Sequence, residues 1–120
     1  MIVQITTLKF FNVMALMTRI AFRRTGGVLG PDVDLTLDFE GLPHKDAQHL
    51  ENLVINAHFF TLPENLVALT TSREFQYTVT IQGSTDKHTV HLSDTSAPNS
   101  LRDLVDELII LAVSKKFGLL

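Results

Sequence analysis

Five histidines are the first residues in this chain that suggest chemistry, because neutral imidazole is a common metal ligand. His44 and His49 are five residues apart in a segment with helical periodicity, whereas a zinc pair on a helix needs a spacing of four. His88 and His91 are three apart in a strand pattern, so their side chains point to opposite faces. We interpret His58 as a helix C-terminal histidine favoured by the dipole, and we expect no metal site or cofactor.

Serine and carboxylate residues give no stronger sign of catalysis. The serines fall in predicted turns, caps or helix surfaces, and none has the G-x-S-x-G setting of a nucleophile. Asp103, Asp106 and Glu107 recur along one predicted helix, which is typical of a solvated face rather than an acid and base pair. The chain has no cysteine, so thiol nucleophiles and thiolate metal ligands are excluded. By elimination we expect a binding module rather than an enzyme; a small enzyme with an unrecognised site is a further alternative.

The stretch RRTGGVLGPD, residues 23–32, is rich in glycine but is not a phosphate loop. It lacks the terminal Lys-Ser/Thr and the G-x-G-x-x-G order, and it precedes a strand pattern rather than a helix. Its glycines permit a tight reversal, and the reversal contains two aliphatic residues, Val28 and Leu29. Two interpretations stay open: these side chains fold back onto the core, or they are held out for a partner to bury.

Length and composition limit the class of protein. The 120 residues correspond to about one domain, and 45% hydrophobic with 19% charged residues is typical of a globular chain. A net charge of −3 argues against nucleic acid as a partner, because nucleic-acid modules usually carry a basic face. The longest uncharged apolar run of the N-terminal segment, residues 10–18, is far shorter than the ~20 residues of a membrane-spanning helix. We therefore expect neither nucleic acid nor a membrane as partner.

The apolar residues 1–18 stand apart from the patterned chain. They have only Lys9 before the apolar run and no small-residue cleavage site after it, which disfavours a signal peptide. A flexible arm and an extension upstream of a start at Met17 are the preferred interpretations, and an extra edge strand is the alternative. We expect a single folded domain over residues 19–120.

Alternating apolar and polar residues predict four strands, at residues 19–25, 33–39, 74–82 and 87–92. The first two flank the glycine-rich reversal and the last two flank residues 83–86, so we expect two hairpins, the first with Val28 and Leu29 near its tip.

Two segments change to a helical period. Residues 41–60 place Ala47, Leu50, Leu53, Val54 and Ala57 on one stripe, and residues 96–116 do so with Leu101, Leu104, Val105, Leu108, Leu111 and Ala112. Residues 61–72 have no clear period and are interpreted as a loop with a few buried anchors. The order ββαββα predicts an α+β fold with a four-stranded antiparallel sheet and both helices on its apolar face.

Several short segments together resemble the emfourin family, over residues 19–111. They are Arg24, Gly26 and Gly27 in an R-x-G-G turn, Phe59-Phe60-x-Leu62-Pro63, Phe75-x-Tyr77, and Ala97-Pro98 before a leucine-rich helix. Emfourins are small protein inhibitors of protealysin and related thermolysin-like metalloproteases. The resemblance implies a bacterial, cytoplasmic inhibitor, monomeric when free, with no cofactor of its own, that blocks the active-site cleft of a zinc protease.

The resemblance also suggests which residues touch the protease. Thermolysin-like proteases accept bulky apolar side chains next to the scissile bond, and a constrained loop presenting such side chains would block the cleft. The candidate contact residues are Arg24, Gly26, Gly27, Val28, Leu29, Gly30, Leu62 and Pro63. The rival hypothesis is a protein-interaction module of the same fold without inhibitory activity.

Overall fold

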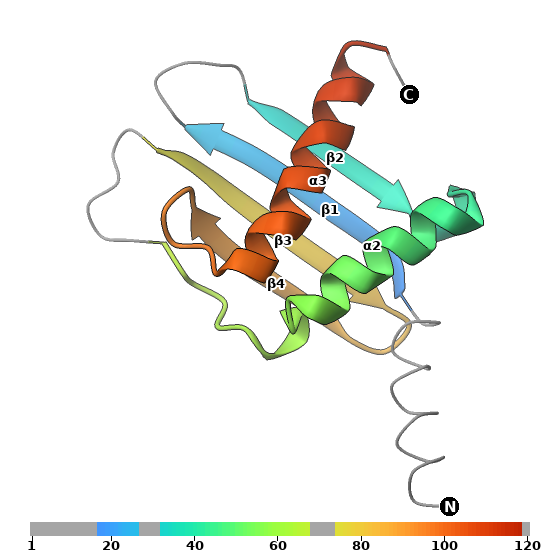
Figure 1. The fold of residues 1–120 in the computed structure, drawn as a ribbon, viewed down its shortest axis with the longest axis horizontal. Helices are drawn as coiled ribbons and strands as arrows, with labels where there is room; N and C mark the ends of the chain where they lie inside the picture. Colours follow the sequence, from blue (N-terminus) through green and yellow to red (C-terminus); the bar gives the residue numbers. More distant parts are fainter. Residues whose placement is uncertain (1–16, 27–31, 68–73, 119–120) are drawn as a thin grey trace, which may run out of the picture.

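The computed structural model describes residues 17–26, 32–67 and 74–118. Its elements in chain order are the strands β1 (Met17–Gly26) and β2 (Val33–Asp38), the short 3-10 helix η1 (Phe39–Gly41), the helix α2 (His44–Asn56), the 3-10 helix η2 (Phe59–Thr61), the strands β3 (Phe75–Gly83) and β4 (Lys87–Ser93), and the helix α3 (Asn99–Lys116). Figure 1 shows these elements as one sheet crossed by two helices. The predicted α+β class and ββαββα order are confirmed.

The sheet has the order β2-β1-β3-β4, and every neighbouring pair is antiparallel. Each predicted hairpin is present, as β1 with β2 and as β3 with β4. The two hairpins are joined at the centre of the sheet by β1 and β3, from Gly26 paired with Phe75 to Met17 paired with Gly83. The sheet therefore depends on pairing between distant parts of the chain.

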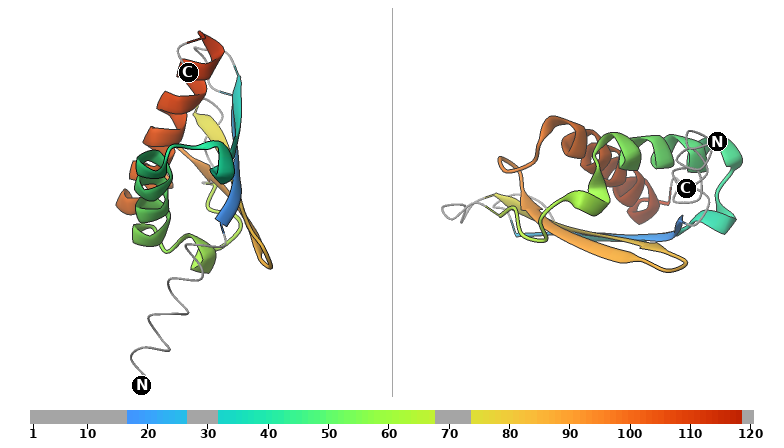
Figure 2. Two further views of the ribbon diagram at one scale, coloured as in Figure 1. Left: turned by 90° about the vertical axis from the view of Figure 1, so that its right-hand side faces the viewer. Right: turned by 90° about the horizontal axis from the view of Figure 1, so that it is seen from below.

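Both helices cover the same face of the sheet, as the edge-on views in Figure 2 show. The core lies between the helices and this face because alternate strand residues point toward the helices. Leu35 of β2 and Leu50 of α2 are buried there. The hydrophobic side chains with no exposed surface are Ile20, Val79, Ile81, Val90, Leu92, Leu101, Leu104, Val105 and Leu108. The opposite face of the sheet carries polar residues and has no described helix on it, as its alternation predicts.

Several element boundaries differ from the sequence prediction; α3, for example, begins at Asn99 rather than at residue 96. The first strand begins at Met17 rather than at residue 19, and Met17 is a buried member of the core. The prediction of one helix over residues 41–60 is wrong at both ends, because α2 spans His44–Asn56 only. His58 is not a helical residue: its φ of 49° lies in the left-handed region, which turns the chain into η2. This reversal places Phe59 in the core, where it is 1% exposed.

The segment after η2 follows the outer edge of β4. Asn65 forms a parallel bridge with His91, in which Leu66 N–H donates to the carbonyl of His91 at 2.7 Å and His91 N–H donates to the carbonyl of Glu64 at 2.7 Å. Leu62 accepts a hydrogen bond at its carbonyl from His88 Nε2, at 2.8 Å. The segment predicted as a loop with buried anchors is thus fixed to the sheet edge over residues 62–66.

Candidate functional site

One end of the sheet contains the described residues that flank residues 27–31 and 68–73; we call it the loop end. Gly26 and Asp32 flank the first segment, and Val67 and Glu74 flank the second. The register places Gly26 beside Phe75, so the end of β1 and the start of β3 lie at the same end of the sheet (Figure 1). Of the predicted contact residues, Gly27, Val28, Leu29 and Gly30 lie outside the described residues, and whether Val28 and Leu29 are core or contact residues stays a prediction.

Gly26 gives the loop end a backbone geometry that favours glycine. Its φ is +78°, which a residue with a Cβ adopts only with strain. A Cβ built there would lie 3.4 Å from the carbonyl oxygen of Glu74, the residue before β3, so the backbone angle rather than lack of space favours glycine. The first glycine of the R-x-G-G turn is therefore required by the direction in which the chain leaves β1.

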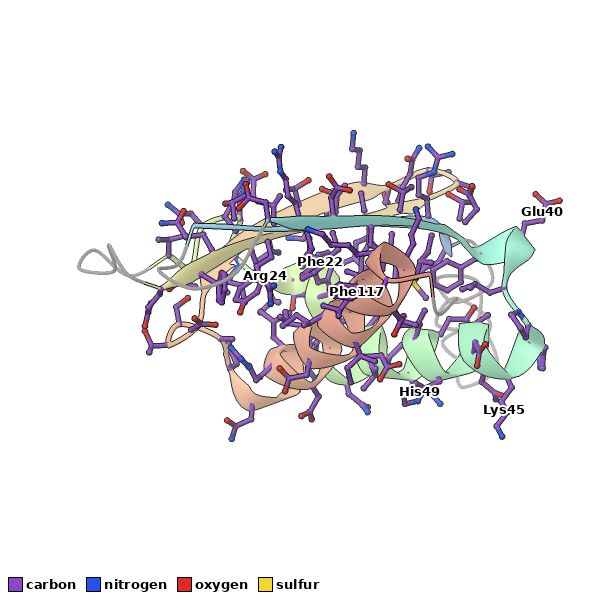
Figure 3. The ribbon with its side chains drawn as sticks, turned by 90° about the horizontal axis from the view of Figure 1, so that it is seen from above. Phe22, Arg24, Glu40, Lys45, His49 and Phe117 are labelled. Carbon is purple, nitrogen blue, oxygen red and sulfur yellow. The ribbon has the colours of Figure 1, made fainter. Side chains whose placement is uncertain are left out.

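Arg24 lies two residues before this turn, on the face of β1 that carries Ile20 and Phe22. Figure 3 labels it between the sheet and the helix layer rather than on the polar face. Its guanidinium carbon is 4.2 Å from the centre of the Phe75 ring, a cation–π contact. Its Nε is buried and has no hydrogen-bond partner among the described residues. Arg23, on the opposite face, is the exposed arginine of the pair.

A hydrogen-bond network fastens the loop end to the start of α3. Asp94, in the turn after β4, accepts hydrogen bonds from the Tyr77 hydroxyl at 2.5 Å and from the backbone N–H of Phe75 at 3.1 Å. Arg102 of α3 donates to the backbone carbonyl of Asp94 at 3.2 Å and reaches its carboxylate at 3.4 Å. One carboxylate therefore connects β3, the β4–α3 turn and α3.

The environment of Tyr77 changes its ionisation. Its ring is buried and stacks against Phe22, with ring centres 6.0 Å apart. Burial, and to a smaller extent the hydrogen bond to the Asp94 carboxylate, raise the pKa of Tyr77 to about 12. Tyr77 therefore stays a hydrogen-bond donor throughout the neutral range, and its bond to Asp94 holds the beginning of β3.

The sequence prediction missed this network because its members are far apart in the chain. One signal was present: Tyr77 falls on the apolar side of its strand, and a buried tyrosine hydroxyl usually finds a partner. Nothing in the spacing identifies that partner as Asp94. Because the Tyr77 hydroxyl keeps its proton in the neutral range, what the arrangement offers is rigidity at the loop end.

Leu62 and Pro63 are not brought next to the other described contact residues. Leu62 is half-buried beside His88, whereas Arg24 is level with Tyr77 and Leu92. Two displacements separate Leu62 from Arg24. Along the strands, His88 is four residues from Leu92, which corresponds to roughly 13 Å; across the sheet, β1 and β4 are two strand spacings of roughly 5 Å apart. The chain from Pro63 runs along β4 toward the loop end, so residues 64–67 connect Leu62 and Pro63 to that end.

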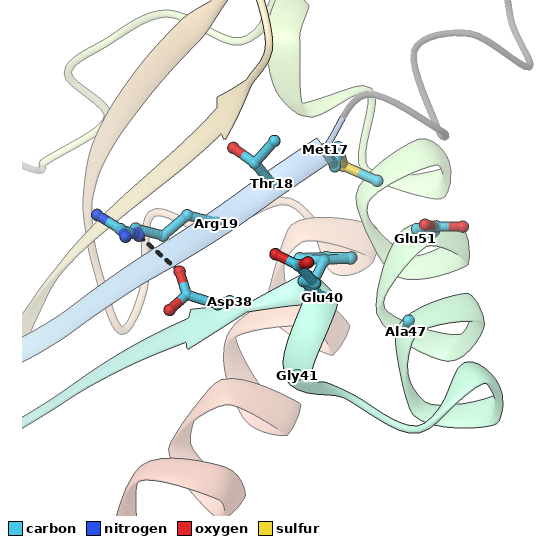
Figure 4. Close-up of a pocket in the computed structure, with 9 residues that line it drawn as sticks. Met17, Thr18, Arg19, Asp38, Glu40, Gly41, Ala47 and Glu51 are labelled. Carbon is cyan, nitrogen blue, oxygen red and sulfur yellow. Dashed lines mark hydrogen bonds and ion pairs between the residues drawn. The ribbon is translucent and has the colours of Figure 1, made fainter.

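A further hollow lies at the other end of the sheet, where β1 begins (Figure 4). It has a volume of about 830 Å³ and lies between the start of β1, η1 and α2. Arg19 and Asp38 form an ion pair at 2.8 Å on one side, and Glu40 and Glu51 are also part of the lining. Burial raises the pKa of Glu51, and the nearby His44 lowers it by less. The described lining contains no serine or histidine, and the hydroxyl of its one threonine, Thr18, donates to the backbone carbonyl of Gln82 at 3.0 Å.

Comparison with sequence models of known families shows which family the chain belongs to. A sequence model of the emfourin family matches residues 22–109, from β1 to the second half of α3. The chain belongs to the emfourin family. No curated protein and no solved structure matched it.

Membership of the emfourin family implies a protease-inhibitor-like function, with a protease as partner. The matched residues include the loop end and every member of the Tyr77, Asp94 and Arg102 network. Within residues 17–26, 32–67 and 74–118, no three histidine or acidic residues are grouped as metal ligands. Neither of the described helices is long and apolar enough to cross a membrane.

Proposed function

We propose that this emfourin-family protein inhibits a thermolysin-like zinc metalloprotease by inserting the reversal after β1 into the active-site cleft. Val28 and Leu29 supply the apolar side chains that occupy the cleft, while Gly26, Gly27 and Gly30 shape the reversal. The inhibitor performs no reaction and holds no cofactor; the zinc ion belongs to the protease. Steric blockage of the cleft is the mechanism.

The observation that carries this proposal is the rigid support on both sides of the reversal. The reversal leaves β1 at Gly26 with a fixed left-handed backbone and enters β2 at Val33, and both strands belong to the same four-stranded sheet. A loop held at two fixed ends loses less conformational freedom on binding than a flexible substrate does. Fixed ends therefore favour affinity through preorganisation, and in this proposal they limit adjustment for cleavage.

Arg24 and Leu62 with Pro63 have supporting roles in this proposal. Arg24 supports the base of the reversal by its contact with Phe75 on the helix side of the sheet. Leu62 and Pro63 begin the segment that follows β4 to the loop end, and they form a second contact at the edge of the cleft.

The test is a titration of a thermolysin-like protease with the purified protein, with residual peptidase activity as the readout. The double variant Val28→Ser/Leu29→Ser should weaken inhibition by about a hundredfold, since two buried aliphatic contacts are lost. Its melting temperature should stay close to that of the parent chain. Ile110→Ser is the matched control, because Ile110 is an aliphatic residue 59% exposed on α3, and it should inhibit normally.

Two outcomes would contradict the proposal. A large drop in the melting temperature of the double variant would place Val28 and Leu29 in the core. Full protease activity at large molar excess of the parent protein, against several thermolysin-like proteases, would instead favour a non-inhibitory interaction module of the same fold.

A further inference from the structure

The outer edge of β2 is open for backbone pairing. In the described part of the chain, β2 pairs with β1 alone, whereas the opposite edge strand β4 is partly covered by residues 64–66. In Figure 3 the β2 edge of the sheet faces the viewer, with the helix layer on one side of the sheet and no described strand in front of β2. An uncovered edge strand presents unpaired N–H and C=O groups that another extended chain can bind.

Two hollows lie beside this edge, one at each end of β2. The hollow at its C-terminal end has a volume of about 310 Å³ and opens between the sheet and both helices; its lining is Leu37, Leu42, Pro43, Asp46, His49, Leu50, Glu107 and Leu111. The hollow at its N-terminal end measures about 300 Å³ and is lined by Asp32, Val33, Asp34, Lys115 and Lys116. Leu37 and Val33 are four residues apart, so the hollows are separated by roughly 13 Å along the strand.

The charges around the edge differ between its two faces. On the polar face β2 carries exposed Asp34 and Asp38, and Asp38 is paired with Arg19 at 2.8 Å. On the helix face the C-terminal end of α3 brings two lysines to the hollow at Val33. Lys116 Nζ donates to the carbonyl of Asp32 at 3.1 Å, while Lys115 is exposed. A strand added here would meet aspartate on one face and lysine on the other.

We propose that the β2 edge is a docking site for an extended peptide segment that adds antiparallel to β2 as a fifth strand. Its residue opposite Leu37 is apolar and enters the hollow at the helices, and its residue opposite Val33 is acidic and reaches Lys115. Between them, on the polar face, a basic residue lies opposite Asp34. Main-chain hydrogen bonds supply affinity, and the alternate side chains supply specificity.

The same charges oppose pairing of β2 with a second copy of this chain. In an antiparallel pair, residues directly opposite each other lie on the same face. A two-fold axis at Thr36 would place Asp34 opposite Asp38 of the other copy, and an axis at Leu35 would place Asp32 opposite Asp38. Like charges directly opposite are destabilising, so the registers with long overlap are disfavoured. A foreign peptide with basic residues at these positions meets no such repulsion.

The test uses the full chain and a synthetic peptide of sequence Lys-Leu-Thr-Val-Lys-Glu, capped at both ends and fluorescently labelled. We expect saturable binding by anisotropy, with hydrogen-exchange protection appearing at the β2 amides. Lys115→Glu should weaken binding by about fivefold, the upper value for one cross-strand charge pair. A peptide ending in Lys instead of Glu should restore binding to that variant. Lys87→Glu, at the exposed start of the opposite edge strand, is the matched control and should bind as the parent does.

Three results of the peptide experiments would overturn the inference. They are absence of saturable binding, protection that appears at β4 rather than at β2, and equal binding of both peptides to the parent and Lys115→Glu chains. Concentration-dependent dimers with protected β2 amides and no added peptide would identify a second copy as the occupant, against the proposal. Protease inhibition is measured separately and does not depend on this site.

Discussion

At the scale of single residues, Asp94 and Tyr77 explain how the loop end is held. The Asp94 carboxylate accepts two hydrogen bonds from β3, one from the backbone of Phe75 and one from the side chain of Tyr77. A charge-assisted hydrogen bond to a carboxylate is stronger than a neutral one, and partial burial strengthens it further. The position of β3 at the loop end therefore depends on a side chain outside the sheet.

The first prediction concerns the ionisation of Tyr77. Tyr77 is the only tyrosine and the chain has no tryptophan, so phenolate absorbance reports this one side chain. The folded protein should titrate with a midpoint near its pKa of about 12, above the ordinary value of 10.0. Between these values the unfolded chain releases the proton while the folded chain keeps it, so the free energy of unfolding should fall as the pH rises from 10.0 to about 12.

Asp94→Asn serves as the control for this titration. Removal of the carboxylate charge should lower the midpoint, but only in part, because burial is the larger cause of the raised pKa. Tyr77→Phe should remove both the absorbance change and its share of the pH-dependent loss of stability. A chain that circular dichroism shows to be folded, and that titrates near 10.0, would contradict the described environment of Tyr77.

The second prediction concerns His58, which has a left-handed backbone. A side chain with a Cβ costs roughly 1–2 kcal/mol in this conformation, whereas glycine adopts it freely. His58→Gly should therefore raise the free energy of unfolding by about 1 kcal/mol in urea denaturation. His58→Ala keeps the Cβ and should give no such gain. Equal effects of the two substitutions would show that the backbone at His58 is not strained.

The sequence identified side-chain direction well and side-chain partners poorly. Alternation placed His88 and His91 on opposite faces of the strand, and the structure confirms this: His88 is half-buried and bonds to Leu62, while His91 is exposed. Direction follows from a local period of two, which the sequence displays. The contact of Arg24 with Phe75 depends on the β1–β3 register, which no local pattern records.

At the scale of elements, the four strands and two helices were predictable because each has a regular apolar period. The residues at which these elements begin and end were harder to predict. Residues 57–60 continue the apolar pattern of α2, yet the chain reverses at His58, because a left-handed residue ends the helix without any glycine to signal it. The candidate site shows the same limit: glycines predicted the reversal after β1, whereas the turn containing Asp94 gave no sign of its role.

At the scale of the whole molecule, the third prediction concerns where the domain begins. The described core starts at Met17, which is 5% exposed, and Thr18 Oγ1 donates to the carbonyl of Gln82 at 3.0 Å. A chain that begins at Met17 should melt at the same temperature as the full chain. A chain that begins at Arg19 should lose about 2 kcal/mol of unfolding free energy, the lower value for removal of a buried methionine side chain.

Urea denaturation of the three chains checks this prediction. Equal stability of the chains that begin at Met17 and Arg19 would show that the folded unit starts at Arg19, as the alternating pattern alone predicts. Reduced stability of the chain that begins at Met17 would show that residues 1–16 contribute to the folded domain.

The central pairing of β1 with β3 determines how this fold is reached. Each half of the chain is a hairpin followed by a helix. The second neighbour of β1 in the sheet is β3, and these two strands come from different halves of the chain. Pairing of such distant segments incurs its entropic cost before most contacts form, so folding of this topology is slow compared with that of a helical bundle of equal length. During synthesis the N-terminal half leaves the ribosome with β1 unpaired on one side. The nascent chain cannot complete its sheet until β3 and β4 have emerged, so the first hairpin waits without its central partner while the second half is made.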